Sequence, residues 1–327
     1  MPNTEFDLIN TYFKRPSRHR SVVKGVGDDC AVLALEAGKQ LVMSMDTIVA
    51  GTHFPATATA DQIGSRAFCT SLSDLAAMGA TPQWFTLALT VPEIDSEWLR
   101  LFGRGLFAVA DRFECDLIGG DTTQGPLCIT VQVHGEVDVN AALYRSGAQV
   151  GDTIFVSHYL GDGAAALAML QQQIDVDQAT RDYLLQRFYA PEPQIVTGQL
   201  ISAFASAAID ISDGLLADAQ HIADASHVDM HIQLEQLPLA PMVQAVASEK
   251  DCRRWALTGG DDYQLLFTVP KQHIAPLSAM AKQHNIAIHA IGHVSAQSTA
   301  GRSHISCSVE GQPYTIDQNR GYQHFTS

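Results

Sequence analysis

Hydrophobic residues recur at the three- and four-residue spacing of an amphipathic helix in several parts of the chain. Between residues 61 and 78 this spacing predicts a helix that contains Asp74 and stops at Gly79. Near the start of the chain, Phe6, Ile9 and Phe13 share one helical face and predict a first helix. The same spacing predicts further helices over residues 95–114, 162–172, 177–189 and 194–206.

Short apolar runs bounded by turn residues predict the strands. Residues 30–35 and 40–46 flank a turn at 36–39, so we expect these two runs to pair and Asp46 to lie at a strand end. Further strands are predicted over residues 83–91, 115–120, 126–137, 153–157, 207–212 and 263–269. Because strands and helices are mixed without a strict βαβ rhythm, the pattern favours an α+β or mixed α/β fold.

The length of the chain suggests two domains. Its 327 residues suit two domains of about 150 residues each. A connection punctuated by glycine lies at residues 144–152, and it predicts one domain over residues 1–143 and a second over residues 144–327.

Composition and charge restrict the function. Asp and Glu outnumber Lys and Arg by 35 to 20, and the resulting formal charge of −15 disfavours nucleic acids and anionic membranes as partners. The longest uncharged run, residues 195–209, is shorter than the roughly 18 residues that a membrane helix needs, so it predicts a buried helix. Acidic residues near the N-terminus do not suit a signal peptide, and we expect a cytoplasmic protein.

The cysteines and the basic residues add little chemistry. The six cysteines have no CxxC spacing and are expected to be core thiols in a reducing compartment. One basic cluster follows the first predicted helix, and it is either a solvated loop or a loop that helps to hold an anionic ligand. Its members are Lys14, Arg15, Arg18, His19, Arg20 and Lys24.

Common nucleotide-binding and hydrolase signatures do not fit the sequence. The segment GVGDDC at residues 25–30 lacks the third glycine of a Rossmann fingerprint, and Asp28 and Asp29 stand where a pyrophosphate would bind. Gly38 and Lys39 lack the first glycine of a P-loop. The HExxH, GxSxG and kinase-type HRD motifs are missing as well.

Aspartates beside Gly, Ser or Thr recur at the ends of predicted elements. Their hard oxygen atoms suit Mg²⁺, which takes carboxylates, water and substrate phosphates as ligands. Any single aspartate could instead cap a helix or form an Asx turn, but such caps do not explain three GGD or GDD loops. The set comprises Asp28, Asp29, Asp46, Asp74, Asp121, Asp210, Asp213, Asp261 and Asp262.

Repulsion among these carboxylates predicts cations. Two like charges about 4 Å apart repel by about 4 kcal/mol at an effective dielectric constant of about 20. We therefore expect a nucleotide to bind through Mg²⁺. Arg145 is either a direct phosphate contact or an ordinary surface arginine.

Eight segments together resemble one enzyme family, in order and over nearly the whole chain. They are GVGDDCAVL, MDTIVAGTHF, SLSDLAAMGATP, LIGGDTT, LYRSGAQVGD, IDISDGL, LTGGDDYQL and GYQHF. SDLAAMGA and IGGDT resemble the aminoimidazole ribonucleotide synthetase-like ATP enzymes, and GTHF and GYQHF narrow the resemblance to the thiamine-monophosphate kinases. The resemblance implies a two-domain fold, a homodimer formed through the N-terminal domains, and phosphorylation of thiamine monophosphate by ATP, the final step of thiamine diphosphate biosynthesis.

The resemblance also implies metal ligands. Met45 would contribute through its backbone, and catalysis would depend on Asp29, Asp74, Asp121 and Asp213. The implied magnesium ligands are Asp29, Ser44, Asp46, Asp74, Asp121, Asp210 and Asp213.

Two further groups are implied by the resemblance. Gly120, Asp121, Arg145 and Ser212 would contact ATP. His53, Asp261 and Tyr322 would contact thiamine monophosphate, and Asp261 stands where the family commonly has glutamate.

A phosphate acceptor explains why no catalytic triad was found. A phosphate monoester has a second pKa of about 6, so at neutral pH it is largely a dianion and needs no general base. Two alternatives stay open at this point. One is another ATP-dependent synthetase of the same superfamily, and the other is a non-catalytic protein that binds divalent cations or nucleotides.

Overall fold

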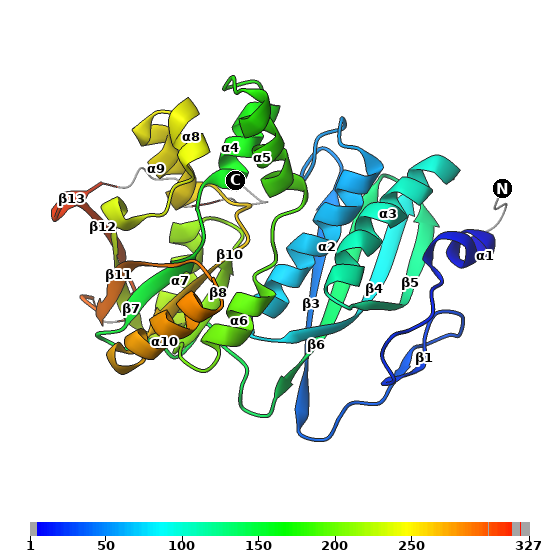
Figure 1. Ribbon diagram of the computed structural model, residues 1–327, viewed down its shortest axis with the longest axis horizontal. Helices are drawn as coiled ribbons and strands as arrows, with labels where there is room; N and C mark the ends of the chain where they lie inside the picture. Colours follow the sequence, from blue (N-terminus) through cyan, green and yellow to red (C-terminus); the bar gives the residue numbers. More distant parts are fainter. Residues whose placement is uncertain (1–4, 300, 316–320, 322–327) are drawn as a thin grey trace. The chain divides into compact units, whose positions relative to one another are not determined.

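The chain forms two units in the computed structural model, which describes residues 5–299, 301–315 and 321 (Figure 1). The first unit holds the chain up to Leu75 together with Ala80–Asn140. The second unit holds Ala76–Gly79 and the chain from Ala141 onward. Each unit is built on a large sheet of its own.

A four-stranded sheet with the strand order β3-β6-β4-β5 forms the centre of the first unit. Strands β4 and β5 are parallel, and the other neighbours are antiparallel. The elements of this unit, in chain order, are α1 (Glu5–Leu8), η1 (Ile9–Phe13), β1 (Val22–Lys24), β2 (Val32–Leu33), β3 (Lys39–Val49), α2 (Ala60–Ala77), β4 (Thr81–Val91), α3 (Ser96–Arg112), β5 (Asp116–Gln124) and β6 (Cys128–Asp138).

Helices α2 and α3 lie together over one face of this sheet (Figure 1). Glycines allow the two helices to approach closely. A Cβ atom on Gly64 would lie 2.3 Å from the carbonyl oxygen of Phe102, and one on Gly105 would lie 1.9 Å from the carbonyl oxygen of Asp61. This contact fixes the position of α2, the helix that carries Asp74, relative to α3.

A seven-stranded sheet with the order β13-β12-β9-β11-β7-β10-β8 forms the centre of the second unit. Among its described strands, β12 and β9 pair in parallel and the other neighbours are antiparallel. The elements, in chain order, are β7 (Thr153–Ser157), α4 (Asp162–Leu170), α5 (Gln178–Tyr189), α6 (Ile195–Ile201), β8 (Ala207–Ile211), α7 (Leu215–Ser226), β9 (Val228–Gln233), η2 (Leu234–Gln236), α8 (Pro241–Val246), α9 (Glu249–Thr258), β10 (Gln264–Val269), α10 (Lys271–Gln283), β11 (Ile288–Ala296), β12 (Ile305–Val309) and β13 (Gln312–Tyr314).

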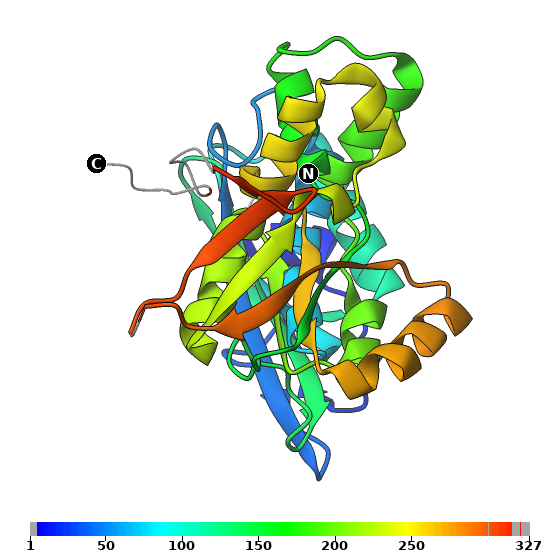
Figure 2. The ribbon, with the colours of Figure 1, turned by 90° about the vertical axis from the view of Figure 1, so that its left-hand side faces the viewer.

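The two faces of this second sheet carry separate cores. Figure 2 shows α7 and α10 on opposite sides of the sheet. Ile209 and Ile211 of β8 pack into the core that contains α7. On the other face, Phe155 and Phe267 stack with ring centroids 5.6 Å apart. Since side chains alternate along a strand, Asp210 lies on the side of β8 away from α7.

The predicted fold class is confirmed, and most predicted elements lie within a few residues of observed ones. Residues 61–78 form α2, and residues 153–157 coincide with β7. The pairing of residues 30–35 with 40–46 was wrong, because the short β2 pairs with β1 and the long β3 pairs with β6 along its whole length. Asp46 is therefore inside β3 and not at its end.

The uncharged run at residues 195–209 does not form one buried helix. Helix α6 ends at Ile201, so the helix predicted to continue to residue 206 was also wrong. Strand β8 begins at Ala207, where the apolar residues pair with β10 in the sheet. Sheet pairing thus overrides the helical spacing at the end of this run.

The cysteines are free thiols, as expected, but not all of them belong to a core. Cys69, Cys115, Cys252 and Cys307 are buried, whereas Cys30 is exposed in the GVGDDC segment. Within the described residues, no helix combines the length and the apolar character that crossing a membrane would require.

We expect Gly105→Ala to destabilise the protein by about 1–3 kcal/mol, because the added methyl group would overlap the carbonyl of Asp61. Gly103→Ala in the same helix is the matched control, since its new Cβ atom would have its nearest neighbour 3.7 Å away. Alanine at position 103 should raise the free energy of unfolding by about 0.5–1 kcal/mol, because it favours the helix more than glycine does. Urea unfolding gives both values, and equal effects of the two variants would contradict the close helix contact.

Candidate functional site

Strand β3 and helix α2 bring three predicted ligands together in the first unit. Ser44, Asp46 and Ile48 lie on the partly buried face of β3, and Met43, Met45 and Thr47 lie on its exposed face. The hydroxyl group of Ser44 donates a hydrogen bond to the carboxylate of Asp74 in α2. We call Ser44, Asp46 and Asp74 the β3–α2 cluster.

Two carboxylates of the β3–α2 cluster lie close enough to influence each other's ionisation. Burial, followed by the nearby charge of Asp74, raises the pKa of Asp46 to about 6. A carboxyl with a raised pKa beside a second carboxylate is electrostatically suited to a divalent cation, which would relieve the repulsion.

The GVGDDC loop separates the roles of its two aspartates. The Asp28 carboxylate accepts the backbone N–H of Asp29 at 3.0 Å and lies 3.0 Å from the Nζ atom of Lys24. The hydrogen bond from Lys24 lowers the pKa of Asp28. Asp29 is exposed, and no hydrogen bond or ion pair to its carboxylate is made within the described part of the chain. Asp29 is thus the carboxylate of this loop that can accept an outside ligand.

Asp121 lies on the opposite face of the sheet from Asp46. Across the sheet, Asp121 of β5 pairs with Ala88 of β4, which pairs with Thr130 of β6, and Thr130 pairs with Thr47 of β3. Paired residues share a face of the sheet, so Asp121 shares the face of Thr47. Asp46 precedes Thr47 in β3 and therefore points to the other face. Strands are spaced by about 4.8 Å, so the three spacings from β3 to β5 separate the two aspartates by about 14 Å across the sheet. One copy of the first unit does not bring Asp121 to the β3–α2 cluster.

Gly120 precedes Asp121 in β5, at a position where the structure leaves no room for a side chain. Its φ is 154°, and a Cβ atom there would lie 1.9 Å from the carbonyl oxygen of Leu87 in β4. The glycine therefore lets β5 run directly against β4 at the position before the aspartate.

His53 lies in the turn that follows β3. Its Nδ1 atom accepts the backbone N–H of Val49 at 3.1 Å, and its carbonyl oxygen accepts a hydrogen bond from Nε of the buried Arg66 at 3.0 Å. These two contacts fix the backbone and one ring nitrogen, so the imidazole has a defined orientation at the end of β3.

The basic cluster of the sequence is tied to acidic residues of the first unit. Arg15 lies 2.9 Å from Asp111, and Arg18 contacts both Asp111 and Asp116. The loop is thereby attached to α3 and β5. These contacts favour the interpretation of a solvated loop over that of an anion-binding loop.

In the second unit, the segment Ser212–Gly214 is held by a residue that the sequence analysis missed. The backbone N–H groups of Ser212, Asp213 and Gly214 all donate to Oδ2 of Asp218, each at 3.1 Å. Burial, followed by the charge of Asp213, raises the pKa of Asp218 to about 7. An aspartate in the first turn of a helix directly after SDG is the signal that could have found it.

The GGDD loop lies beside the same segment. Asp261 has a φ of 74°, and its N–H donates to the carbonyl oxygen of Ser212 at 2.8 Å. The N–H of Tyr263 donates to the carbonyl oxygen of Ile211, also at 2.8 Å. The second unit thus brings Ser212, Asp213 and Asp261 together.

The remaining predicted residues of the second half differ in their exposure. Asp210 is 6% exposed on β8. Arg145 is exposed, and its carbonyl oxygen accepts a hydrogen bond from Ser226 at 3.2 Å. Tyr322 lies outside the described residues.

No three His, Cys, Asp or Glu side chains of the described residues form a group that could hold a metal ion. The predicted ligands instead fall into separate small groups, and the β3–α2 cluster combines two carboxylates with a hydroxyl. Their oxygen atoms fit Mg²⁺, which commonly takes only one or two protein carboxylates and completes its shell with water and phosphates.

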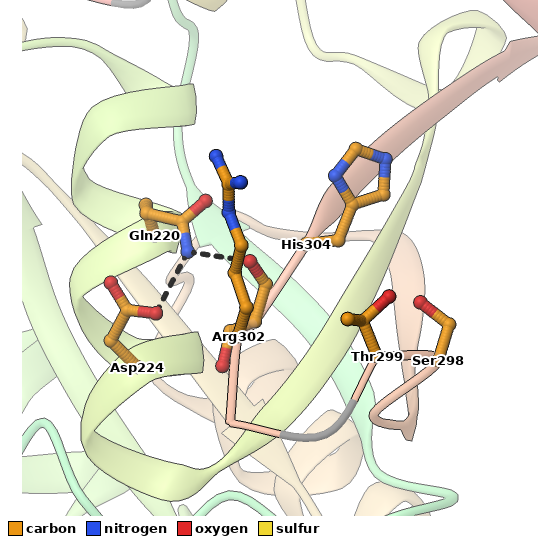
Figure 3. A pocket seen from close by; sticks show the side chains of 7 residues that line it. Gln220, Asp224, Ser298, Thr299, Arg302 and His304 are labelled. Atoms are coloured by element: carbon orange, nitrogen blue, oxygen red, sulfur yellow. Dashed lines mark hydrogen bonds between the residues drawn. The ribbon is translucent and has the colours of Figure 1, made fainter.

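A cavity of about 700 Å³ lies elsewhere in the second unit (Figure 3). It is lined by Gln220 and Asp224 of α7 and by the loop before β12. The nearer of these two helix residues, Gln220, follows Gly214 by six residues, which corresponds to about 9 Å along α7. The cavity does not coincide with Ser212, Asp213 or Asp261.

Family models match both halves of the chain. AIR synthase related protein, N-terminal domain, matches residues 27–137, and AIR synthase related protein, C-terminal domain, matches residues 149–303. The chain thus belongs to the AIR synthase related proteins.

Full-length relatives narrow the assignment. Thiamine-monophosphate kinase of Salmonella typhimurium is 42% identical over 325 residues, covering 99% of this chain and 98% of the relative. The Bacillus subtilis enzyme of that name is 33% identical over 331 residues, covering 98% and 99%. The chain belongs to the thiamine-monophosphate kinase family, and the resemblance seen in the sequence is confirmed.

Solved structures agree with this family. A thiamine-monophosphate kinase from Stenotrophomonas maltophilia has a TM-score of 0.83 and 40% identity, covering 91% of this chain and 93% of that chain. AaThiL complexed with AMPPCP and TMP has a TM-score of 0.77 and 31% identity, covering 92% of each chain. Hydrogenase maturation protein HypE in complex with ATP, at 19% identity and a TM-score of 0.75 with 96% and 95% coverage, shares the fold.

We expect Asp46→Asn to stabilise the metal-free protein at pH 7. The folded-state pKa of Asp46 is about 6, above its ordinary value of 3.8, so ionisation of this group disfavours the folded state. The penalty is complete above about pH 6 and disappears as the pH falls towards about 4. Allowing for partial exposure, the gain at pH 7 should be about 1–2 kcal/mol.

Urea unfolding in EDTA at pH 7 and at pH 5 measures this effect. The difference between wild type and Asp46→Asn should shrink at pH 5, because the wild-type carboxyl is then largely protonated. A difference that is the same at both pH values would contradict the raised pKa. Asp138→Asn changes an exposed carboxylate of the same unit and serves as the control.

Proposed function

We propose that this chain transfers the γ-phosphoryl group of ATP to thiamine monophosphate, producing thiamine diphosphate and ADP. The observation that carries the proposal is the identity of 42% with a curated thiamine-monophosphate kinase over 99% of this chain. The related structure with bound AMPPCP and TMP supports a nucleotide and a thiamine phosphate as the two ligands.

The acceptor phosphate requires no deprotonation by a side chain. With a second pKa of about 6, thiamine monophosphate is largely a dianion at neutral pH. The task of the protein is to align two anionic groups and to offset their repulsion, which are the main contributions to catalysis of phosphoryl transfer. Acidic loops that bind cations suit this task better than a catalytic triad.

Magnesium fits the oxygen ligands that the chain offers. In the β3–α2 cluster, two carboxylates and a hydroxyl group already lie together. Bound Mg²⁺ would supply Lewis-acid neutralisation of phosphate oxygens. We assign its ligands as Asp29, Ser44, Asp46, Asp74, Asp121, Asp210 and Asp213, with the carbonyl of Met45, and we expect catalysis to depend most on Asp29, Asp74, Asp121 and Asp213.

The two aspartates of GVGDDC have different roles in this proposal. Asp28 is engaged by Lys24 and by the backbone of Asp29. We therefore assign Asp29 as the direct ligand and Asp28 as the residue that orders the loop.

The nucleotide and the substrate are assigned to separate residues. Gly120, Asp121, Arg145 and Ser212 would contact ATP. His53, Asp261 and Tyr322 would contact thiamine monophosphate, and the negative charge of Asp261 suits the positive thiazolium ring. The contact between Asp261 and Ser212 in the second unit supports neighbouring positions for the two ligands.

A homodimer formed through the first unit completes the proposal. The exposed face of β3 carries apolar side chains, with Met43 56% and Met45 62% exposed. Asp121 lies on this same face of the sheet. Packing of two copies through this face would cover the methionines and would allow Asp121 of a second copy to approach the β3–α2 cluster. We place the dimer in the cytoplasm, in agreement with its free thiols.

Purified protein incubated with ATP, Mg²⁺ and thiamine monophosphate is expected to form ADP and thiamine diphosphate in equal amounts. Asp74→Asn should lower turnover by about a hundredfold to a thousandfold, a loss comparable to removing a group that stabilises transition-state charge. Chromatography of both products measures this.

Asp138→Asn is the control for this experiment and should retain wild-type turnover. ADP formed without thiamine diphosphate would reject the substrate assignment. Wild-type turnover in a folded Asp74→Asn variant would remove Asp74 from the site.

The double substitution of Met43→Lys and Met45→Lys is expected to convert the dimer into a monomer, because two like charges would be buried at each side of the interface. Sedimentation equilibrium measures the association. Substitution of the exposed Val196→Lys on α6 is a control that should not change it. If the double variant stays dimeric, the interface lies on another face.

A further inference from the structure

Two aspartates to which the proposed chemistry gives no role are almost completely buried behind the loops of the second unit. Asp218 is 2% exposed and Asp262 is 1% exposed. Burying a carboxylate is unfavourable unless hydrogen bonds compensate its charge. Both aspartates accept hydrogen bonds from backbone N–H groups, Asp218 from the segment Ser212–Gly214 and Asp262 from Gly161 and Gly163.

Asp218 organises the loop on the nucleotide side. A single oxygen, Oδ2, accepts three consecutive N–H groups, from Ser212, Asp213 and Gly214, each at 3.1 Å. Three bonds to one atom fix the orientation of three successive peptide planes. The directions of the Ser212 and Asp213 side chains follow from those planes.

Asp262 organises the loop on the substrate side. It uses both oxygens, since Oδ2 accepts the N–H of Gly161 at 2.7 Å and Oδ1 accepts the N–H of Gly163 at 3.1 Å. The preceding residue, Asp261, has a φ of 74°, a conformation that is uncommon for a residue with a side chain. A Cβ atom on Gly163 would lie 2.4 Å from the carbonyl oxygen of Asp261, so the two segments are in direct contact.

We propose that Asp218 and Asp262 are positioning residues of the phosphotransferase site, Asp218 for the nucleotide loop with Ser212 and Asp213, and Asp262 for the substrate loop with Asp261. The bond from Asp261 N–H to the Ser212 carbonyl oxygen, at 2.8 Å, joins the two loops. The inference rests on the proposed function, because it takes the ligands of these loops from it.

The different use of oxygen atoms gives the two positions different tolerances to asparagine. At Asp218 the amide oxygen of asparagine can replace Oδ2 and accept all three N–H groups. At Asp262 asparagine must place its NH₂ group against the N–H of Gly161 or Gly163, since both oxygens are acceptors. Asp218→Asn should therefore be mild, and Asp218→Ala and Asp262→Asn should be severe.

Calorimetric titration of the full-length protein tests this, with the Mg²⁺ complex of AMPPCP and, separately, thiamine monophosphate as probes. Asp262→Asn is expected to weaken thiamine monophosphate binding by about tenfold or more while nucleotide binding changes by less than about threefold. Asp218→Ala should show the reverse selectivity. Asp218→Asn should restore nucleotide binding to within about threefold of wild type.

Asp229→Asn is a matched control in the same unit. Asp229 is 6% exposed, and its two oxygens accept the N–H groups of Ser298 and His304, each at 2.8 Å. Asp229 lies in β9 and repeats the bonding of Asp262 towards the loop before β12, which bears no predicted site residue. Asp229→Asn should lose stability in urea unfolding without weakening either probe.

The outcomes separate the inference from the proposed function. If Asp262→Asn and Asp229→Asn lose similar stability and neither changes binding, Asp262 is only structural and the inference is overturned. Equal weakening of both probes by Asp262→Asn also overturns it. A different outcome would reject the proposed function alone. In it, the wild-type protein binds both probes and the variants lose binding with the expected selectivity, but the wild-type protein forms no thiamine diphosphate. The positioning roles would then stand.

Discussion

Repulsion between neighbouring carboxylates is the constraint on which the organisation of both units depends. The chain resolves it in two ways. Some aspartates are satisfied internally, as when Asp28 pairs with Lys24 or when Asp218 accepts three backbone N–H groups. Others keep an uncompensated charge: burial and the charge of Asp74 both raise the pKa of Asp46, whereas the backbone N–H groups bound to Asp218 lower its pKa against the effect of burial. The first kind holds loops in place, and the second kind creates a demand for cations.

This division gives aspartate two functions in one protein. A carboxylate surrounded by backbone N–H groups is a rigid internal support, because each bond to its charge is stronger than a neutral hydrogen bond. A carboxylate beside another carboxylate is suited to bind a cation, because the cation offsets the repulsion between the two negative charges. Asp262 is such an internal support, and we assign the neighbouring Asp261 to a contact with the substrate.

The sequence predicted local structure well and long-range pairing poorly, for a physical reason. The helix over residues 61–78 was found because its spacing is a property of the segment itself. The partner of β3 was missed because β6 lies almost ninety residues further along, and periodicity within β3 contains no information about it. Nor could the sequence place Asp46 and Asp121 on opposite faces, since that depends on the register of four strands. The residues assigned to the site came from motifs, while Asp218 was recognised only from its bonds.

The alternation of side chains along β3 limits how the sequence of this strand can evolve. Its alternation assigns Ser44 and Asp46 to one face and Met43 and Met45 to the other. Inserting or deleting one residue within the strand would exchange the faces of everything beyond it. In our proposal, cation binding and subunit association would then be lost in the same event. Substitutions can alter the two properties separately, but changes in length cannot, so we expect the length of β3 to be more strictly preserved than most of its residues.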